Sequence, residues 1–516
     1  MRTTRPTTRA LRTALAAASV LCLTGVTAAN AAGGVGSRGV GDPYHPTYGN
    51  GGYDVGHYNI DVSYTPGTDH LRGRTRIDAT ATQDLSQFNL DFGLDVTSIR
   101  VNGRLAAFDE RDDHEVVVRP ASALAKGEAM QVDVTYRGTP SEVTIDGFTA
   151  WIRTADGAVA VGEPEIAAWW FPSNDHPSDK ALFDISVSVP KGVEAISNGT
   201  LAAKSQDPRN ANRTTWAWHS AKPMATYLAF MAVGQYDITR STMQDGTPII
   251  NAIASNGGAE GQYAAADFKR TGELIDWEAR QWGPYPFEAT GNVAPNATFG
   301  FALENQTRPV YTRSFWRNGS NMYVLVHEHA HQWYGDSVSV QTWPNIWLNE
   351  GFASYAEWRW SETHGEGTGN EILQGYYESL PASSSFWDVK IGDPGSGHEF
   401  AWPVYTRGAM TLQALRNKVG TPAFFAIMRG WATQHRYGNG TIEQFIALAE
   451  QESGQELSAF FDTWLYTAER PAITKANGFP ASMVDAAASG TALAAPTVPS
   501  IAKMDAVHRE LIAQRR

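Results

Sequence analysis

The segment that contains His327, Glu328 and His331 constrains the fold and the chemistry of this chain more than any other. The three residues stand in the order His-Glu-x-x-His and follow a run of apolar residues. On a helix, residues four apart lie on one face, so both imidazoles can bind one metal ion while the glutamate lies beside them. The spacing therefore predicts a buried helix over residues 319–334 that carries two ligands of a zinc site.

A third metal ligand is expected from a second helical pattern over residues 346–361. A catalytic zinc ion takes three protein ligands and keeps one open position. Glu350 stands in this pattern, eighteen residues separate it from His331, and it is the candidate. The alternative pattern, with a third histidine six residues after the second, is excluded because Ser337 occupies that position. His329 lies on the opposite face of the first helix and is expected to be a packed or exposed histidine.

Composition and charge restrict the class of protein. A chain of 516 residues is too long for one ordinary core, so two or more domains are expected. The formal net charge of −13 and the pI of about 5.5 argue against nucleic acid or an anionic membrane as the main partner. The only cysteine, Cys22, lies in the N-terminal segment, so the remainder has no disulfide. We expect a monomer without stable membrane insertion.

The N-terminal segment 1–31 has the pattern of a secretory signal peptide. Arginines within residues 2–12 precede the apolar run 14–28, and residues 29–31 (Ala-Asn-Ala) form a small-x-small cleavage site. The apolar run is too short for a transmembrane anchor. The pattern predicts a secreted, extracellular protein. The glycine-rich residues 32–45 are expected to form a flexible leader.

Residues 46–239 are predicted to form a β-domain. Apolar and polar residues alternate in several short runs, for example over 58–64, 132–136 and 183–189, which is typical of half-buried strands. Almost no helical periodicity interrupts these runs. The pattern predicts an antiparallel sheet domain, and together with the helices that follow it an α+β fold.

Helical patterns dominate the second predicted domain, residues 240–471. Thr441 and Gln444 have the spacing of a capping box. Residues 379–400 are predicted to be a loop, and residues 472–516 a low-complexity tail of little fold with at most one helix. The helices are expected over 259–282, 319–334, 346–361, 405–418, 421–433, 441–452 and 456–466.

Two further stretches can serve a metal-dependent hydrolase, which needs groups that stabilise an oxyanion and position the substrate. One is Phe-Gly-Phe-Ala-Leu-Glu-Asn-Gln at 299–306, and the other is Pro-Val-Tyr-Thr-Arg-Gly-Ala-Met at 403–410. With the zinc motif, they make the chain resemble the aminopeptidase N family of gluzincin zinc metallopeptidases. The matching residues are the His-Glu-x-x-His motif with Glu350, then Ala302, Glu304 and Asn305 of a Gly-Ala-Met-Glu-Asn motif, Tyr405 and Gly408-Ala409 of a Tyr-x-Lys-Gly-Ala element, and Phe171-Pro172 to Lys180-Ala181 of the N-terminal domain.

The resemblance implies a thermolysin-like catalytic domain after a saddle-like or sandwich-like β-domain, and a role for each matching residue. His327, His331 and Glu350 would bind one Zn²⁺. Glu328 would act as general base and acid toward a zinc-activated water, and Tyr405 would stabilise the oxyanion. The resemblance further implies that Glu304 pairs with the free α-ammonium of a peptide substrate, beside Ala302 and Asn305.

Two positions depart from the family pattern. A second acid for the substrate amine is expected before Phe171, and either Glu163 or Glu165 can supply it. Phe301 replaces a family glycine and is expected to crowd the site and alter the side chain accepted at the N-terminal position. The long helical C-terminal domain usual in the family is also missing after residue 471, which would leave the cleft more open.

Three functions are compatible with the motifs. The first is a secreted zinc aminopeptidase. The second is another gluzincin activity, either a thermolysin-type endopeptidase or an epoxide hydrolase of the leukotriene-hydrolase kind. The third is a non-enzymatic binding module with a relic metal site. Because all three ligands and Glu328 are present together with Glu304, the sequence favours the aminopeptidase.

Overall fold

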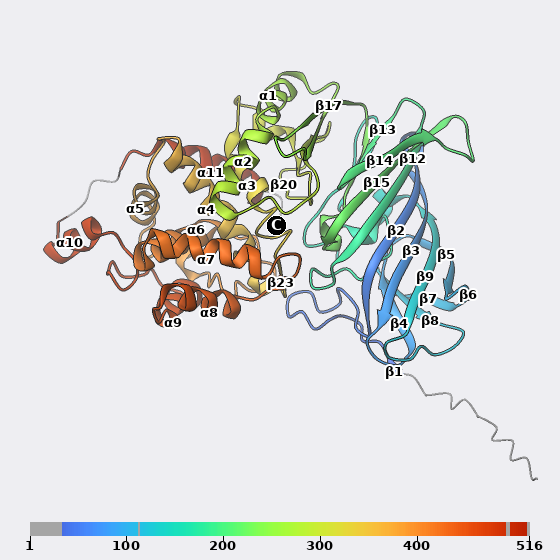
Figure 1. Ribbon diagram of the computed structural model, residues 1–516, viewed down its shortest axis with the longest axis horizontal. Helices are drawn as coiled ribbons and strands as arrows, with labels where there is room; N and C mark the ends of the chain where they lie inside the picture. Colours follow the sequence, from blue (N-terminus) through green and yellow to red (C-terminus); the bar gives the residue numbers. More distant parts are fainter. Residues whose placement is uncertain (1–33, 112–113, 492–495, 513–516) are drawn as a thin grey trace, which may run out of the picture.

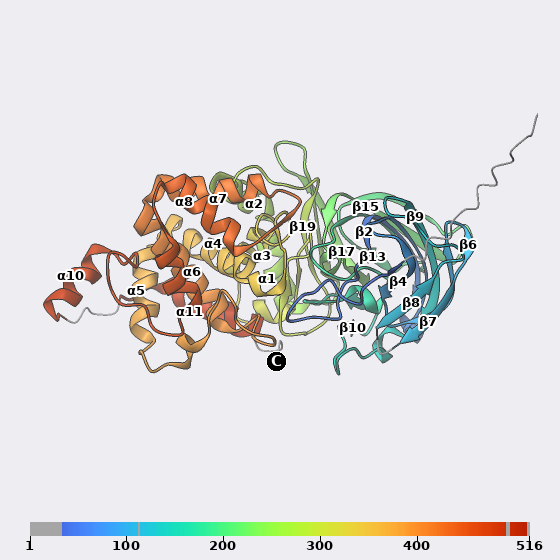
Figure 2. The same cartoon turned by 90° about the horizontal axis from the view of Figure 1, so that it is seen from below.

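The computed structural model describes residues 34–111, 114–491 and 496–512, and the predicted signal peptide lies outside this range. Strands make up the N-terminal half and helices most of the C-terminal half, and the two halves lie side by side (Figures 1 and 2). Within the described residues, no helix combines the length and the apolar character needed to cross a membrane.

The largest sheet has eight strands in the order β14-β15-β12-β2-β3-β9-β5-β6. Burial alternates along β3, so every second side chain faces the core, as the alternating sequence predicts. Neighbouring strands are antiparallel except β2 and β12, which run parallel with Ile60 opposite Ile185. The strands are β2 (Tyr53–Thr65), β3 (His70–Ala81), β5 (Asp95–Val101), β6 (Arg104–Leu105), β9 (Ala129–Gly138), β12 (Ala181–Pro190), β14 (Thr200–Gln206) and β15 (Arg213–Met224).

Two four-stranded sheets complete the N-terminal half. One has the order β1-β4-β8-β7 and the other β10-β11-β16-β13. The central strands of the second sheet, β11 and β16, are wholly buried, which explains why they are apolar throughout rather than alternating. The strands are β1 (Gly34–Val35), β4 (Leu85–Asp91), β7 (Ala107–Arg111), β8 (Glu115–Arg119), β10 (Trp151–Arg153), β11 (Ala158–Ala160), β13 (Glu194–Ile196) and β16 (Met231–Gly234).

A mixed five-stranded sheet, β17-β18-β19-β21-β20, begins the C-terminal half. The predicted domain boundary at residues 239–240 falls inside its first strand. Strand β20 lies at the edge and pairs only with β21 among the described residues. The strands are β17 (Tyr236–Thr242), β18 (Pro248–Ala254), β19 (Thr290–Ala294), β20 (Ala302–Leu303) and β21 (Val310–Tyr311), with a separate parallel pair β22 (Ser339–Val340) and β23 (Asn439–Gly440).

Up to residue 466, the helices agree with the predicted ranges apart from their ends, with two larger differences. The single helix expected over 259–282 is broken into α1 and α2 at Lys269–Arg270, and α5 was not predicted. The predicted capping box is present, since Gln444 N donates to Thr441 Oγ1 and Thr441 N donates to Gln444 Oε1. The helices are α1 (Gly258–Phe268), α2 (Thr271–Trp282), α3 (Met322–Ala330), α4 (Trp347–Thr363), α5 (Gly369–Ser379), α6 (Trp402–Val419), α7 (Thr421–Gln434), α8 (Ile442–Ser453), α9 (Ser458–Phe461), α10 (Ala481–Ser489) and α11 (Pro499–Ile512).

The expectation of a low-complexity tail of little fold over 472–516 is wrong for the described residues. They form two helices, α10 and α11, and α11 contacts α3 and α6. Met504, Val507 and Leu511 are buried on one face of α11 at the spacing of an amphipathic helix. The alanine- and proline-rich stretch before this helix obscures its short apolar period in the sequence.

The described part of the predicted flexible leader, residues 34–45, is also packed against the protein. Asp42 is 1% exposed, and its Oδ2 accepts a hydrogen bond from Trp343 N at 2.8 Å and lies 3.2 Å from His176 Nε2. Its Oδ1 accepts from the backbone of Tyr44 and His45. One buried carboxylate thus joins the leader to both halves of the molecule, so glycine content alone is a poor guide to flexibility here.

Replacing Asp42 with alanine is expected to lower the free energy of unfolding by about 1–3 kcal/mol, because buried donors lose their acceptor. Burial raises the pKa of Asp42, but hydrogen bonds from His176 and Trp343 outweigh it and lower the pKa to about 2. The stabilisation is therefore full above the ordinary value of 3.8 and is lost as the pH falls toward 2. Denaturant unfolding of wild type and Asp42→Ala between pH 7 and pH 2.5 measures the difference.

The control for this variant is Asp61→Ala, since Asp61 is an exposed aspartate of β2. Its unfolding is expected to stay within about 0.5 kcal/mol of wild type. Equal stability of Asp42→Ala and Asp61→Ala at pH 7 would contradict an anchored leader.

Candidate metal centre and substrate site

Helix α3 presents the first two candidate ligands. Asn321 caps its N-terminus, with Asn321 Oδ1 accepting from Val324 N at 3.4 Å, and every residue of the helix is buried. The helix ends at Ala330, four residues earlier than predicted. His331 nevertheless keeps right-handed helical torsion angles, φ −57° and ψ −25°. Its side chain therefore stays on the same face as that of His327.

The three predicted ligands converge on one point. Glu350, in the first turn of α4, places its Oε2 atom 3.3 Å from His327 Nε2 and 3.6 Å from His331 Nε2. Two ligand atoms of a tetrahedral zinc ion at ordinary bond lengths stand roughly 3.4 Å apart. The donor set and its spacing therefore fit Zn²⁺, with one position left open.

The other nitrogen of each histidine ring is also hydrogen-bonded. His327 Nδ1 lies 2.7 Å from Glu357 Oε1, and His331 Nδ1 lies 3.0 Å from the carbonyl oxygen of Tyr334. Both partners accept a hydrogen bond from the Nδ1–H group, so the Nε2 atom of each ring faces Glu350. Metal-free imidazoles are thereby already oriented for binding.

The surroundings of the two histidines favour positive charge. Burial lowers the pKa of His327, but hydrogen bonds to Glu350 and Glu357 outweigh burial and raise this pKa to about 9. Burial opposes the charged form of His331 as well, yet the negative charge of Glu304 and contact with Glu350 raise its pKa above the ordinary value. A buried site rich in carboxylates suits a divalent cation.

Glu328 lies next to the ligands and is suited to transfer a proton. Burial raises its pKa to about 7, and positive charge on His327 and His331 partly offsets this. None of the described residues hydrogen-bonds to its buried Oε1 atom, and one oxygen of its carboxylate lies close to Glu304 and His331. A water molecule there would find an acceptor.

His329 points away from the metal centre, as the helical spacing predicts. Its Nε2 atom lies 2.9 Å from Asn292 Oδ1 of β19. Burial lowers the pKa of His329 to about 3, so this ring is a neutral part of the core.

The stretch from Ala302 to Asn305 lines the side of the metal centre that faces the β-domain. Glu304 Oε1 accepts a hydrogen bond from Tyr227 Oη at 3.2 Å, and Glu304 stands close to Glu328 and His331. Ala302 lies on edge strand β20. Asn305 is fully buried and donates to the carbonyl oxygen of Leu228 at 3.0 Å, so it joins the two domains.

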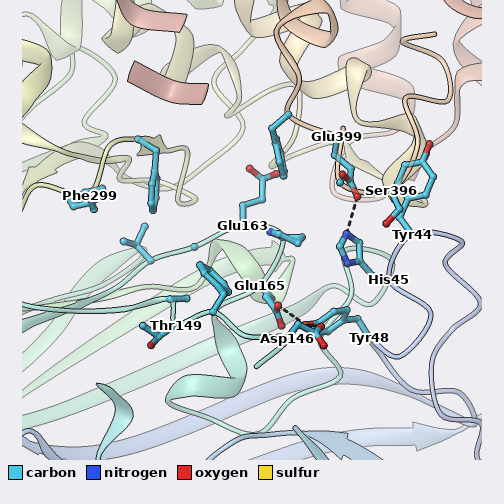
Figure 3. A pocket seen from close by; sticks show the side chains of 18 of the residues that line it. Tyr44, His45, Tyr48, Asp146, Thr149, Glu163, Glu165, Phe299, Ser396 and Glu399 are labelled. Atoms are coloured by element: carbon cyan, nitrogen blue, oxygen red, sulfur yellow. Dashed lines mark hydrogen bonds and ion pairs between the residues drawn. The ribbon is translucent and has the colours of Figure 1, made fainter. Parts of the chain in front are cut away.

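The structure separates the two acids left open by the sequence. Both line a cavity of about 640 Å³ together with Phe299 and Phe301. Figure 3 shows the two acids pointing to different parts of this cavity, Glu165 toward Tyr48 and Glu163 toward the catalytic domain. Glu165 is hydrogen-bonded to Tyr48 Oη. Burial raises the pKa of Tyr227, the hydrogen-bond partner of Glu304, and the negative charges of Glu304 and Glu163 raise it further.

Tyr405 lies in the first turn of α6, beside the metal ligands. Its ring stacks on that of His327 with centroids 5.9 Å apart and an interplanar angle of 22°. Because this contact fixes the ring next to a ligand, the phenol stands near the reacting groups. The residue is 1% exposed and also contacts His508 of α11.

Sequence reasoning missed three residues of the site. Glu357 follows Glu350 by seven positions on one helix, so helical periodicity could have identified it. Tyr227 and His508 lie in distant segments, and no local pattern connects them to the zinc motif.

Comparison with known families covers both domains. The sequence-family model described as Peptidase family M1 domain matches residues 290–464. A second family model, described as Peptidase M1 N-terminal domain, matches residues 55–228. The chain belongs to peptidase family M1. The resemblance predicted from the motifs is thus confirmed, and with it a zinc metallopeptidase as the class of protein.

Curated relatives are about a quarter identical to this M1 peptidase chain over the aligned residues. Aminopeptidase M1-A of Oryza sativa subsp. japonica is 26% identical over 397 residues, which cover 72% of this chain and 43% of the relative. Aminopeptidase N of Streptomyces lividans is 28% identical over 330 residues, covering 58% and 36%. The chain spans less than half the length of either relative.

Solved structures confirm the predicted fold class, a β-rich N-terminal domain followed by a helical catalytic domain. An M1 zinc metallopeptidase from Deinococcus radiodurans is 27% identical with a TM-score of 0.74, covering 86% of this chain and 100% of that one. A mutant M1 zinc metallopeptidase from the same organism, bound to a Tyr-Ser-Ala substrate, is 26% identical with a TM-score of 0.73, covering 84% and 99%.

Replacing Glu350 with glutamine is expected to weaken zinc binding by at least about tenfold, because a neutral amide replaces an anionic ligand. Zinc content after dialysis against graded chelator concentrations measures the change. The matched control is Glu362→Gln on the same helix, where Glu362 pairs with Arg416 and not with a histidine. Zinc retention by Glu350→Gln equal to that of the control would contradict the ligand assignment.

Proposed function

We propose that this protein is a zinc-dependent aminopeptidase that hydrolyses the N-terminal peptide bond of peptides with a free α-amine. The observation that carries the proposal is the position of Glu304, whose carboxylate lies within a few ångströms of Glu328 and His331. A fixed negative charge beside a metal centre suits an ammonium group one residue from the bond that is cut. Curated relatives named as aminopeptidases support the same activity.

Zinc, when bound, supplies a Lewis acid that polarises the scissile carbonyl group and lowers the pKa of water. Glu328 accepts a proton from the attacking water and passes it to the leaving amine. Its pKa of about 7 suits both roles, since the group can gain and lose a proton near neutral pH. Tyr405 donates a hydrogen bond to the oxyanion from its stacked position on His327.

Substrate positioning follows from both domains. Glu304 and, from the N-terminal domain, Glu163 bind the α-ammonium group, while Tyr227 holds Glu304 in place. Strand β20, which contains Ala302, lies at the edge of its sheet and can pair with an extended peptide as an added strand. Phe301 lines the cavity next to Glu163 and restricts the side chain of the N-terminal residue.

An endopeptidase or an epoxide hydrolase does not require a pair of acids at this place. A binding module does not require Glu328 with a pKa near neutrality next to a complete ligand set. We further propose that the enzyme is secreted and acts outside the cell. The basic residues and the short apolar run of segment 1–31 support this localisation.

The first test compares aminoacyl chromogenic amides with free and with N-acetylated α-amines, with and without a zinc chelator. We expect cleavage of the free amines only, and loss of cleavage in chelator. Glu304→Gln is expected to lower kcat/KM for free amines by about tenfold or more, because a charged partner of the ammonium is lost. Equal cleavage of acetylated substrates would indicate an endopeptidase instead.

A second test replaces Glu328 with glutamine. We expect turnover to fall by at least about 10²-fold because the general base is lost, while zinc content stays at the wild-type level. Steady-state kinetics and elemental analysis of the same samples measure both. Near wild-type turnover in a zinc-loaded Glu328→Gln enzyme would exclude the proposed mechanism.

A further inference from the structure

The C-terminal helix α11 reaches the metal centre through one side chain. His508 is 2% exposed and lies behind the ligand His327, with ring centroids 6.1 Å apart. Its ring also contacts Tyr405, at 5.7 Å between centroids. In Figure 1 the helix lies next to α3 and α4, which carry the three ligands. A segment distant in sequence thus touches both a ligand and the proposed oxyanion donor.

One carboxylate oxygen connects His508 to the ligand. Glu357 Oε1 lies 2.7 Å from His327 Nδ1 and 3.0 Å from His508 Nε2. No described residue hydrogen-bonds to Glu357 Oε2 or to His508 Nδ1. Both imidazoles are therefore hydrogen-bonded to the same oxygen atom. Among the described residues, Glu357 is the only hydrogen-bond partner of the His508 side chain.

We propose that His508 is a positioning residue for the metal centre. By holding Glu357 Oε1, it keeps the hydrogen bond to His327 Nδ1 in place and so keeps His327 Nε2 directed at Glu350. The assignment rests on the proposed zinc-dependent function. It adds that α11 supplies part of the metal site, beyond the ligands on α3 and α4.

The energetic argument concerns a fully buried carboxylate. Glu357 lies in the core, and negative charge there is costly unless donors surround it. Hydrogen bonds from His327 Nδ1 and His508 Nε2 to Glu357 Oε1 supply such donors. Without His508, His327 Nδ1 is the one donor to Glu357 Oε1 that remains among the described residues, and the carboxylate can turn away from His327. Partners of this kind typically change metal affinity or activity by 10–100-fold, about as much as expected here.

The same three residues are poorly arranged for a metal ion of their own. His327 Nδ1 and Glu357 Oε1 are 2.7 Å apart, the length of a strong hydrogen bond. Two ligands of one tetrahedral zinc ion stand roughly 3.4 Å apart, as the Nε2 atoms and Glu350 do. The cluster His327–Glu357–His508 therefore serves the neighbouring metal position and binds no ion itself.

Several other contacts hold α11 in place, so a variant at position 508 should keep the helix docked. Asp505 Oδ1 accepts from Tyr376 Oη at 2.9 Å, and Arg317 pairs with Glu510 at 2.8 Å. Ser500 is buried and hydrogen-bonded to Ser361 at 2.8 Å. These anchors lie along the whole helix, and none of them involves Glu357.

The experiment compares two replacements of His508 in the full chain. His508→Phe keeps a packed ring without a donor, and His508→Gln keeps an N–H donor that can reach Glu357. The control is Asp505→Asn, which weakens another hydrogen bond of the same helix by neutralising the acceptor of Tyr376 Oη. For each protein, zinc affinity is measured by chelator competition without substrate, and thermal unfolding of the metal-free form reports whether α11 remains docked.

We expect His508→Phe to lose about 10–100-fold in zinc affinity and about tenfold in kcat under saturating zinc, with KM within about twofold of wild type. His508→Gln is expected to recover most of the zinc affinity, and Asp505→Asn to match wild type. Wild-type zinc affinity in a folded His508→Phe protein, or an equal loss in Asp505→Asn, would overturn the proposal. Because zinc affinity is measured without substrate, failure of the aminopeptidase assignment would leave the zinc-affinity outcomes unchanged.

Discussion

The structure depends on the pairing of buried imidazoles with buried carboxylates. His327 lies between Glu350 on its Nε2 side and Glu357 on its Nδ1 side, and all three are almost inaccessible to solvent. A carboxylate without donors in such a place would be strongly destabilising, so each must be matched by a cation or a hydrogen bond. The helices α3 and α4 can pack against each other here because these pairs are satisfied.

The same constraint explains why two domains form one site. Residues of the β-domain contact the segment that carries Glu304. Arg308 donates to the carbonyl oxygens of Ser197 and Gly199, and Asn198 donates to that of Gln306 at 2.9 Å. These contacts connect buried polar groups across the boundary, so the position of Glu304 relative to the metal ligands is set by the N-terminal domain as well as by α3.

The part of the site that could be predicted depends on local sequence patterns, whereas the other part depends on contacts between distant segments. A four-residue spacing on one helix placed His327 and His331 correctly, and alternation placed the long strands. Glu163 and Glu165 are two residues apart, and the sequence alone does not show that Glu165 is hydrogen-bonded to Tyr48 while Glu163 points toward the catalytic domain. Asp42 and His508 come from segments whose composition suggested flexibility. Their buried contacts could not be predicted, because a single buried polar contact leaves no periodic signal in a sequence.

The distance in sequence between the ligands and His508 has a consequence for biosynthesis. Glu350 precedes His508 by more than a hundred and fifty residues, and helices α5 to α10 are made between them. A growing chain can therefore close helices α3 and α4 around the two histidines while Glu357 still lacks its second imidazole. Full metal retention is then expected only after α11 has been made, which links the zinc site to a segment far from its ligands in the sequence.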